Sequence, residues 1–160
     1  RGEVRGSTEG FLHRGLVMAG KVITKWTGEL GFDSLVTGHH VVMDGDSEFG
    51  GNDTGPRPKP LLLAALTGCS GMDVVSILKK MQVKEYDFEM EADGESTEEH
   101  PVVYHTITVT YKFSGENLPV DKIVKAVSLS TEKYCGVNAM LQQSAKVITR
   151  ITVNGSEVKS

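Results

Sequence analysis

The sequence predicts an α+β fold, and three observations lead to this prediction. Short segments rich in β-branched and aromatic residues come before and after one long apolar segment, residues 60–82. The later segments alternate apolar and polar residues, which is typical of antiparallel strands with one face in water. Strands and helices do not follow a βαβα order and no internal repeat occurs, so a doubly wound parallel sheet is not expected.

The first three segments, residues 20–27, 31–37 and 39–44, are short and separated by glycine-bearing turns. They are expected to form a three-stranded meander. Residues 45–58 combine acids, glycines and prolines with almost no apolar residue, which indicates an exposed loop.

Residues 60–82 are expected to form a long, largely buried helix. Apolar residues recur there at spacings of three and four, which is the period of one helix face. Pro60 suits the first turn, where a backbone N–H has no partner within the helix. Lys79 and Lys80 suit the carboxyl end because of the helix dipole.

Alternating patterns predict two antiparallel strands over residues 83–95 and 101–116, joined by a polar hairpin loop. Helical spacing then returns, with a break expected at residues 128–131. Thr131 is expected to cap the second helix. Residues 146–160 are expected to form a closing strand. The order is therefore three strands, a helix, two strands, two helices and a strand.

The chain has 160 residues, a formal net charge of −4 at pH 7 and scattered basic residues. Binding to nucleic acid or to an anionic membrane surface is therefore not expected. The longest uninterrupted apolar run, residues 60–66, is far shorter than the ~20 residues that span a bilayer, so we expect a soluble protein. Residues 1–17 are expected to be a flexible leader or an added extension, and residues 18–160 a single domain.

The sequence contains no GxGxxG segment opening a helix after a strand, no P-loop, no HExxH and no CxxC. No cofactor and no metal ion are therefore expected. His39, His40 and Asp44 lie close together in sequence. Adjacent residues of a strand point to opposite faces, however, so the two histidines cannot both reach one ion without distortion.

Cys69 and Cys135 are the only cysteines, and each falls inside a predicted helix. Two cysteines are too few for a disulfide scaffold, which favours a cytoplasmic location. The simplest interpretation is that both are small buried hydrophobic residues. The functional interpretation requires a reactive thiolate, and therefore a nearby cation and access for an oxidant.

A side-chain cation is needed to activate Cys69, because the residue lies too deep in its predicted helix for the dipole of the first turn to help. Arg57 and Lys59 are the nearest candidates in sequence. Gly68 and Gly71 flank Cys69 and are expected to thin the packing around its sulfur, leaving access from an adjoining cavity.

Two acidic residues accompany the cysteines. Asp73 lies one turn beyond Cys69 on the same helix face, where an unpaired anion would raise the thiol pKa. We expect Asp73 to be a hydrogen-bonded buried acid that orients a partner side chain, because isolated buried acids are rare. Glu132, three residues before Cys135, raises the same question and is expected to be solvated. Both acids stay candidates for supporting the thiolate, beside Arg57 and Lys59.

Two segments, RPKPLLLAALTGCSGMDVVSILKKM (57–81) and STEKYCGVNAMLQQSAKV (130–147), resemble the two cysteine-bearing helices of the OsmC/Ohr family of thiol-dependent hydroperoxide reductases. In this chain as in the family, the first cysteine lies in a proline-led, alanine-rich helix, and the second lies in a helix just before the last strand. The resemblance covers about residues 18–155. Its specificity comes from finding both segments at this separation.

The resemblance implies an OsmC-like fold, with antiparallel sheets wrapped around long central helices in an intertwined homodimer whose active sites lie at the interface. Cys69 would be the peroxidatic thiolate of a cysteine-dependent peroxidase, reducing an organic hydroperoxide to an alcohol and becoming a sulfenic acid. Cys135 would then form a disulfide with Cys69, which a dithiol reductant reduces. The cycle would serve oxidative-stress defence without a metal or organic cofactor.

The sequence differs from the family pattern in its charges. When Pro58 and Cys69 are aligned with the family pattern, Lys59 stands where the family has the glutamate that follows the helix-opening proline. The early strands contain Lys21 and Lys25 but no arginine. These differences keep an alternative open. The chain would then be a non-catalytic OsmC-fold protein that binds a hydrophobic or acyl small molecule in the dimer-interface cavity.

Overall fold

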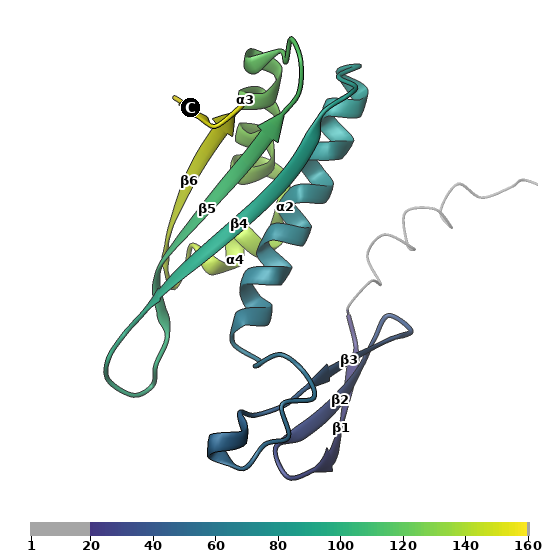
Figure 1. The fold of residues 1–160 in the computed structure, drawn as a ribbon, viewed down its shortest axis with the longest axis vertical. Helices are drawn as coiled ribbons and strands as arrows, with labels where there is room; N and C mark the ends of the chain where they lie inside the picture. Colours follow the sequence, from purple (N-terminus) through teal and green to yellow (C-terminus); the bar gives the residue numbers. More distant parts are fainter. Residues whose placement is uncertain (1–19, 160) are drawn as a thin grey trace, which may run out of the picture. The chain divides into compact units, whose positions relative to one another are not determined.

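The computed structural model describes residues 20–159, so the expected leader at residues 1–17 lies outside the described part of the chain. The chain divides into two compact units between Pro58 and Lys59, and each unit is described by itself (Figure 1). The first holds a small sheet and a loop, and the second holds a larger sheet with helices. This arrangement confirms the predicted α+β class.

The first unit contains three antiparallel strands in the order β1-β2-β3. They are β1 (Val22–Gly28), β2 (Gly31–Val36) and β3 (His39–Met43). Thr37 and Gly38 join β2 to β3 with φ of 47° and 87°. Positive φ at both positions is what a two-residue type I′ hairpin turn requires. The sheet is the meander that the sequence predicts.

The loop after β3 is organised around the carboxylate of Asp44, a residue that is 2% exposed. Its Oδ1 accepts a hydrogen bond from the Gly45 amide at 2.7 Å, and its Oδ2 accepts from the amides of Asn52 and Thr54, both at 3.1 Å. The Thr54 hydroxyl donates a fourth bond at 2.8 Å and is the main reason that the pKa of Asp44 is lowered. Apart from the short 3₁₀ turn η1 (Ser47–Phe49), the loop is irregular, as expected.

The second unit contains a four-stranded sheet with helices on one face (Figure 1). The strands, in sheet order, are β4 (Asp87–Ser96), β5 (Tyr104–Ser114), β6 (Lys146–Val153) and β7 (Ser156–Val158). The α-helices are α2 (Pro60–Lys80), α3 (Val120–Leu129) and α4 (Gly136–Leu141). Strands β5 and β6 are parallel, and the helical crossover between them makes this pairing possible.

The core of this unit lies between β5 and the helices. Four alternating residues of β5 are at most 2% exposed: Ile107, Val109, Tyr111 and Phe113. They are the apolar face that the sequence pattern predicts. Helix residues packed into the same core include Leu66, Val74, Leu78, Ile123, Ala126 and Val127.

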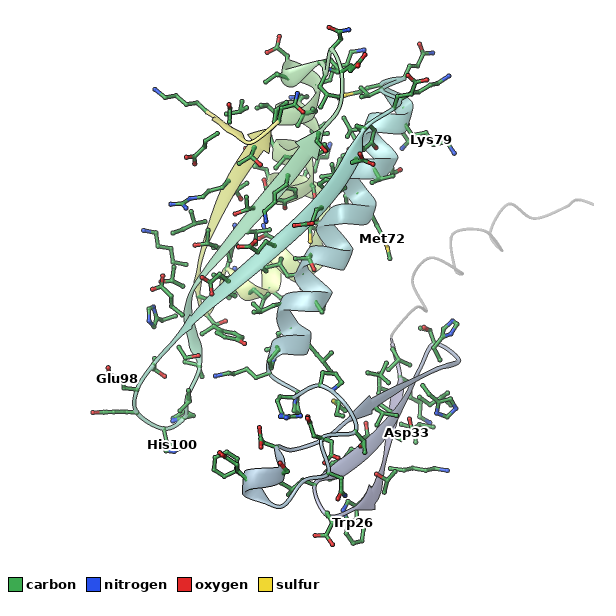
Figure 2. All side chains as sticks on the ribbon, in the orientation of Figure 1. Trp26, Asp33, Met72, Lys79, Glu98 and His100 are labelled. Carbon is green, nitrogen blue, oxygen red and sulfur yellow. The ribbon has the colours of Figure 1, made fainter. Side chains whose placement is uncertain are left out.

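Helix α2 buries only one stripe within its own unit. Leu66, Ser70, Val74 and Leu78 are buried at a spacing of four, so one face of the helix contacts the rest of the unit. The opposite side exposes apolar residues, including Met72, which is 77% exposed. Figure 2 shows Met72 and Lys79 projecting outward from α2. The helix is therefore less buried in a single chain than the sequence pattern predicts.

By length and composition alone, α2 is long and apolar enough to cross a membrane, since an 18-residue window has a mean hydropathy of 1.8. The expectation from the sequence rested on the uninterrupted apolar run, residues 60–66, and missed that the whole of α2 reaches this limit. The apolar run is interrupted by Gly68, Ser70 and Gly71. These residues do not lower the mean hydropathy of the helix enough to exclude it as a membrane-spanning segment by composition. In this structure α2 packs along the core of its own unit, as the core helix of a globular protein does.

The second helical region differs from the prediction in the position of its break. Helix α3 runs directly into a π-helical segment, η2 (Ser130–Tyr134), and Thr131 lies inside that segment. The break falls instead at Cys135, whose φ of −74° and ψ of 101° are extended, and Cys135 caps α4. A thiol is not among the usual capping groups, so the preference for Ser, Thr, Asp or Asn pointed to the wrong residue.

The closing segment is a hairpin rather than one strand. Strand β6 turns at Asn154 and Gly155, which have φ of 51° and 79°, and returns as the short strand β7. Asn-Gly is the preferred pair for a type I′ turn, so the sequence contained a signal for this turn.

Candidate functional site

Two segments that are distant in sequence bring three reactive side chains together in the second unit. The sulfurs of Cys69 and Cys135 and a carboxylate oxygen of Asp73 all lie within 4.8 Å of one another. Helix α2 supplies Cys69 and Asp73 from positions one turn apart, and the start of α4 supplies Cys135. We call these three residues the thiol–carboxylate cluster.

Cys135 is held by two hydrogen-bond donors. The hydroxyl of Ser70 donates to its Sγ at 3.2 Å, and the amide of Asn138 donates at 3.3 Å. The residue is 3% exposed, whereas Cys69 is only partly buried. Cys69 is therefore the more accessible of the two thiols.

Asp73 is half-buried and accepts a hydrogen bond from the Ser130 hydroxyl at 3.2 Å. The same hydroxyl lies 3.4 Å from the carbonyl oxygen of Ser70, so Ser130 connects the carboxylate to the helix that supplies Cys69. Ser130 itself is completely buried. The carboxylate is thus oriented by a side chain from η2.

Sequence reasoning missed the polar residues that surround the cluster. Ser70, Ser130 and Asn138 are each at most 2% exposed. The Asn138 side chain donates to the Thr131 carbonyl at 2.8 Å, which fixes the start of α4 against η2. Ser70 occupies the stripe of α2 that faces the core, so a polar residue at an apolar helical position was the available signal.

Tyr111 belongs to the same surroundings, although its sequence pattern indicates only a core residue. Burial raises the pKa of Tyr111, and the negative charges possible on Cys135, Asp73 and Cys69 raise it further. A hydrogen bond with Ser70 acts in the opposite direction. The phenol therefore lies close enough to the cluster to sense its charge.

The pKa of the Cys69 thiol is raised in this chain, chiefly by burial. The backbone amide of Val137 lowers it, while Cys135 and Asp73 raise it further. Within residues 20–159, no lysine or arginine is among the groups that shift it most. A single chain thus supplies acidic neighbours to the thiol rather than the cation that a reactive thiolate requires.

Arg57 belongs to the first unit and is bound within its own loop. Its guanidinium pairs with Asp53 at 2.7 Å and with Asp46 at 3.4 Å, and donates to the carbonyl oxygen of Gly55 at 2.9 Å. The hydrogen bond to Asp53 is the largest influence raising the pKa of Arg57. The charge of Arg57 is therefore already offset by two carboxylates in this chain.

Lys59 lies just before α2, ten residues from Cys69, which corresponds to about 15 Å along a helix axis. Its Nζ donates to the Ser96 hydroxyl at 3.0 Å and lies 4.8 Å from the centre of the Tyr104 ring. Lys59 therefore points to the hairpin between β4 and β5. Glu132, the last of the supporting candidates, is exposed and accepts a hydrogen bond from the Ser128 hydroxyl at 3.0 Å.

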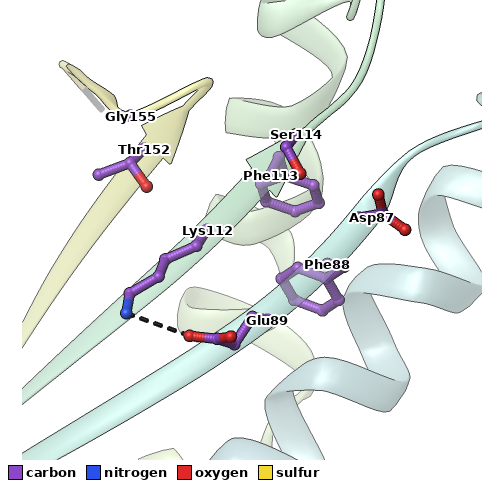
Figure 3. A pocket seen from close by; sticks show the side chains of 8 residues that line it. All are labelled: Asp87, Phe88, Glu89, Lys112, Phe113, Ser114, Thr152 and Gly155. Atoms are coloured by element: carbon purple, nitrogen blue, oxygen red, sulfur yellow. Dashed lines mark hydrogen bonds and ion pairs between the residues drawn. The ribbon is translucent and has the colours of Figure 1, made fainter.

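Several hollows lie around this unit, and they differ in whether a residue of the thiol–carboxylate cluster lines them. A hollow of about 390 Å³ is lined by Asp73 together with Ser76, Ile77, Lys80, Met81, Leu129 and Tyr134. Gly68 and Gly71 line another of about 650 Å³ beside Met72 and Phe88, but Cys69 does not line it. The hollow in Figure 3, about 430 Å³, lies over β4, β5 and the end of β6 beside the Lys112–Glu89 ion pair, and no cluster residue lines it.

The fold and the site together define a class: an α+β protein with two sheets, in which a long central helix brings one free thiol beside a second. A family model described as OsmC-like protein matches residues 50–150. The chain belongs to the OsmC-like family, which confirms the resemblance found in its sequence.

Individual relatives support this assignment. Protein YhfA of Escherichia coli (strain K12) is 36% identical over 124 residues, which cover 77% of this chain and 90% of YhfA. A hypothetical protein from Aquifex aeolicus VF5 has a TM-score of 0.76 at 30% identity, over 86% of this chain and 98% of its own. The organic hydroperoxide resistance protein OhrB of Bacillus subtilis has a TM-score of 0.57 at 19% identity, over 85% and 99% of the two chains, and shows the shared fold alone.

Proposed function

We propose that this protein is a cysteine-dependent peroxidase that reduces organic hydroperoxides in oxidative-stress defence. The convergence of Cys69 and Cys135 carries the proposal, because two free thiols 66 residues apart reach the same 4.8 Å cluster. Membership of the OsmC-like family and a fold shared with an organic hydroperoxide resistance protein support it.

The proposed reaction begins at Cys69, the more accessible thiol. Its thiolate attacks the terminal oxygen of the hydroperoxide, the O–O bond breaks, and the products are a Cys69 sulfenic acid and an alkoxide that takes up a proton to become the alcohol. The Cys135 thiol then attacks the sulfenic sulfur and releases water as the disulfide forms. A dithiol reductant restores both thiols. The protein would work in a reducing compartment such as the cytoplasm.

A second copy of the chain is the proposed source of the missing positive charge. Burial and acidic neighbours raise the pKa of Cys69 in the single chain, whereas the attack requires a thiolate. Exposed apolar residues on α2 and on the sheet of the first unit favour a homodimer; they include Leu62, Met72, Val75, Trp26 and Phe32. With the active sites at that interface, Arg57 and Lys59 stay candidates for activating the thiolate.

The experiment is a single turnover with cumene hydroperoxide and fully reduced protein. Each wild-type chain is expected to consume one equivalent and to lose both free thiols, with a Cys69–Cys135 link detected by peptide mass spectrometry. Cys69→Ser is expected to consume none. Cys135→Ser is expected to consume one equivalent and stop at a sulfenic acid that dimedone traps. If the wild type keeps both thiols after excess hydroperoxide, the peroxidase proposal fails.

A second candidate function is binding of a hydrophobic or acyl small molecule without catalysis. The raised pKa of Cys69 favours it, as does an apolar hollow of about 230 Å³ beside Lys59. The two functions differ in the thiol pKa of the assembled protein, measured from the pH dependence of Cys69 alkylation. A pKa well below the ordinary value of about 8.5 supports catalysis, and a pKa above it supports binding.

A further inference from the structure

We propose that Cys69, Asp73 and Cys135 form a binding site for Zn²⁺, with two sulfur ligands, one carboxylate oxygen and a fourth position open to water. The proposal goes beyond the peroxidase activity, and the binding itself does not depend on that activity. It concerns the reduced protein, in which both thiols are free.

The spacing of the three groups suits a tetrahedral zinc ion. With Zn–S near 2.3 Å and Zn–O near 2.1 Å, neighbouring ligand atoms in a tetrahedron are about 3.5 to 3.8 Å apart. The three ligand atoms lie within 4.8 Å of one another, so closing around the ion requires movements of about 1 Å, within reach of side-chain rotation. Two thiolates and one carboxylate leave one position for water, as in zinc sites with three protein ligands.

Hydrogen bonds from neighbouring groups orient two of the three ligands, Cys135 and Asp73. Ser70 and the Asn138 amide donate to Cys135, and Ser130 donates to Asp73. For Cys69, the backbone N–H of Val137 acts to lower the thiol pKa, which favours the thiolate that binds a metal. Such outer-shell partners fix the orientation of metal ligands and reduce the rearrangement needed on binding. A pair of cysteines that only filled space would not require these donors.

The charge of the cluster also suits a cation. Three groups that can each carry a negative charge converge at a partly buried place, and a divalent cation at their centre offsets that charge. Zn²⁺ displaces both thiol protons as it binds, so the site forms from neutral cysteines with the release of two protons. Thiolate sulfur selects zinc over magnesium or calcium, which prefer oxygen ligands.

A path from solvent reaches the cluster at Asp73. This residue lines the hollow of about 390 Å³ that lies between α2, the end of α3 and Tyr134. An ion entering there meets the carboxylate before the two sulfurs. The motif search of the sequence had no means of finding such a site, because two of its ligands lie one helical turn apart and the third comes from a distant cap.

Zinc and hydroperoxide would compete for the same sulfurs. While zinc holds both thiolates, their electron pairs are bound to the metal. The sulfurs are then poor nucleophiles toward a hydroperoxide. When a hydroperoxide does oxidise them, the O–O bond breaks, an S–S bond forms, and two electrons pass from the thiolates to the peroxide. Uptake of two protons gives one alcohol and one water, and Zn²⁺ is released. This competition rests on the proposed function, whereas zinc binding does not.

The test is a titration of the full, reduced chain with Zn²⁺ against a chromophoric chelator, in a phosphine reductant. One ion per chain is expected. Removal of one ligand in Cys69→Ser, Cys135→Ser or Asp73→Asn is expected to weaken binding by more than about 100-fold, and Ser130→Ala by about 10- to 100-fold. Co²⁺ in place of Zn²⁺ is expected to show a thiolate-to-metal charge-transfer band that both cysteine variants lose.

Matched controls separate this site from surface ligands. Asp93→Asn removes an exposed carboxylate from β4, and the double variant His39→Gln/His40→Gln removes two exposed histidines; both are expected to bind zinc as the wild type does. Wild-type protein oxidised to the disulfide provides a test without mutation and is expected to lose the ion and regain it on reduction. The proposal is overturned if reduced wild type binds no zinc, or if the cluster variants bind as tightly as Asp93→Asn. Hydroperoxide consumption by zinc-free protein is measured separately, so failure of the peroxidase proposal remains distinguishable.

Discussion

Asp44 in the first unit and Asp73 in the second are both shielded acids, but their surroundings differ. Asp44 accepts four hydrogen bonds from the loop that it organises. Asp73 accepts one among the described residues, from Ser130, and lies beside two sulfurs. The Asp44 carboxylate accepts several hydrogen bonds from one loop and therefore stabilises the conformation of that loop. The Asp73 carboxylate accepts fewer hydrogen bonds and lies next to two thiols, so its oxygens remain available to bind a ligand.

The largest expected effect is on the rate of hydroperoxide consumption, which should depend on the thiol–carboxylate cluster and not on the loop around Asp44. Cys69→Ser is expected to reduce hydroperoxide consumption to the uncatalysed level, because the variant lacks the attacking sulfur. Asp44→Asn is expected to leave the rate per folded molecule unchanged, because the hydrogen bonds that its carboxylate accepts from described residues all come from its own loop. Both are measured by loss of hydroperoxide over several turnovers with a dithiol. A large loss of rate in folded Asp44→Asn would break the contrast between the two acids.

The next effect concerns stability of the second unit. Leu78→Ala is expected to lower the free energy of unfolding by about 2–5 kcal/mol, since Leu78 is fully buried in the core. Asp73→Asn is expected to lower it by less than about 1 kcal/mol, because the amide oxygen can still accept the bond from Ser130. Urea unfolding measures both. A cost for Asp73→Asn as large as that for Leu78→Ala would assign Asp73 a structural role like that of Asp44.

A smaller effect is expected on the reactivity of Cys69. The negative charge of Asp73 contributes to raising the Cys69 pKa, so Asp73→Asn is expected to lower that pKa and to speed alkylation by iodoacetamide near neutral pH. Alkylation of zinc-free Cys135→Ser protein across a pH series isolates the Cys69 thiol. Asp93→Asn serves as the control for an exposed carboxylate. A pKa that stays unchanged or rises in Asp73→Asn would contradict this assignment.

The smallest effect is the acid sensitivity of the first unit. Because hydrogen bonds lower the pKa of Asp44 in the folded protein, its contribution to stability is present above the ordinary value of about 3.9 and is lost as the pH falls through the folded pKa. The protection of the Asn52 and Thr54 amides from hydrogen exchange, relative to their intrinsic exchange rates, is expected to fall as the pH drops below the ordinary value. Asp44→Asn is expected to flatten the pH dependence. An equal pH dependence in both proteins would show that another group is responsible.

The sequence predicted the strands, the long helix and the family because these depend on local patterns. The period of two in β5 and the spacing of three and four in α2 reflect which side chains face a core, and each can be found without knowing the partner element. The break at Cys135 was predicted at the wrong residues, and the hairpin at the end was predicted as a single strand. A thiol rarely caps a helix, and the Asn-Gly turn signal lay inside an apolar strand pattern.

Only part of the candidate site could be predicted from the sequence. Cys69 and Asp73 could be paired because residues four apart lie on one helix face. The surroundings of Cys135 could not be predicted, since Ser70 comes from a helix 65 residues earlier and only packing brings them together. Lys59 and Arg57 were chosen for closeness in sequence, but Lys59 binds Ser96 and Arg57 binds Asp53. Lysine and arginine side chains are long and flexible and can reach many partners. Closeness in sequence is therefore a weak guide to which group they contact.

By itself, the sequence determined the α+β class, the order of the elements up to the closing hairpin and the presence of two cysteines, because composition and periodicity are properties of the chain alone. The tertiary structure decided that those thiols meet beside Asp73, that Ser70, Ser130 and the Asn138 amide orient the cluster, and that burial raises the pKa of Cys69. The physical reason is that distance, desolvation and hydrogen-bond geometry between distant segments exist only after the helices have packed on the sheet.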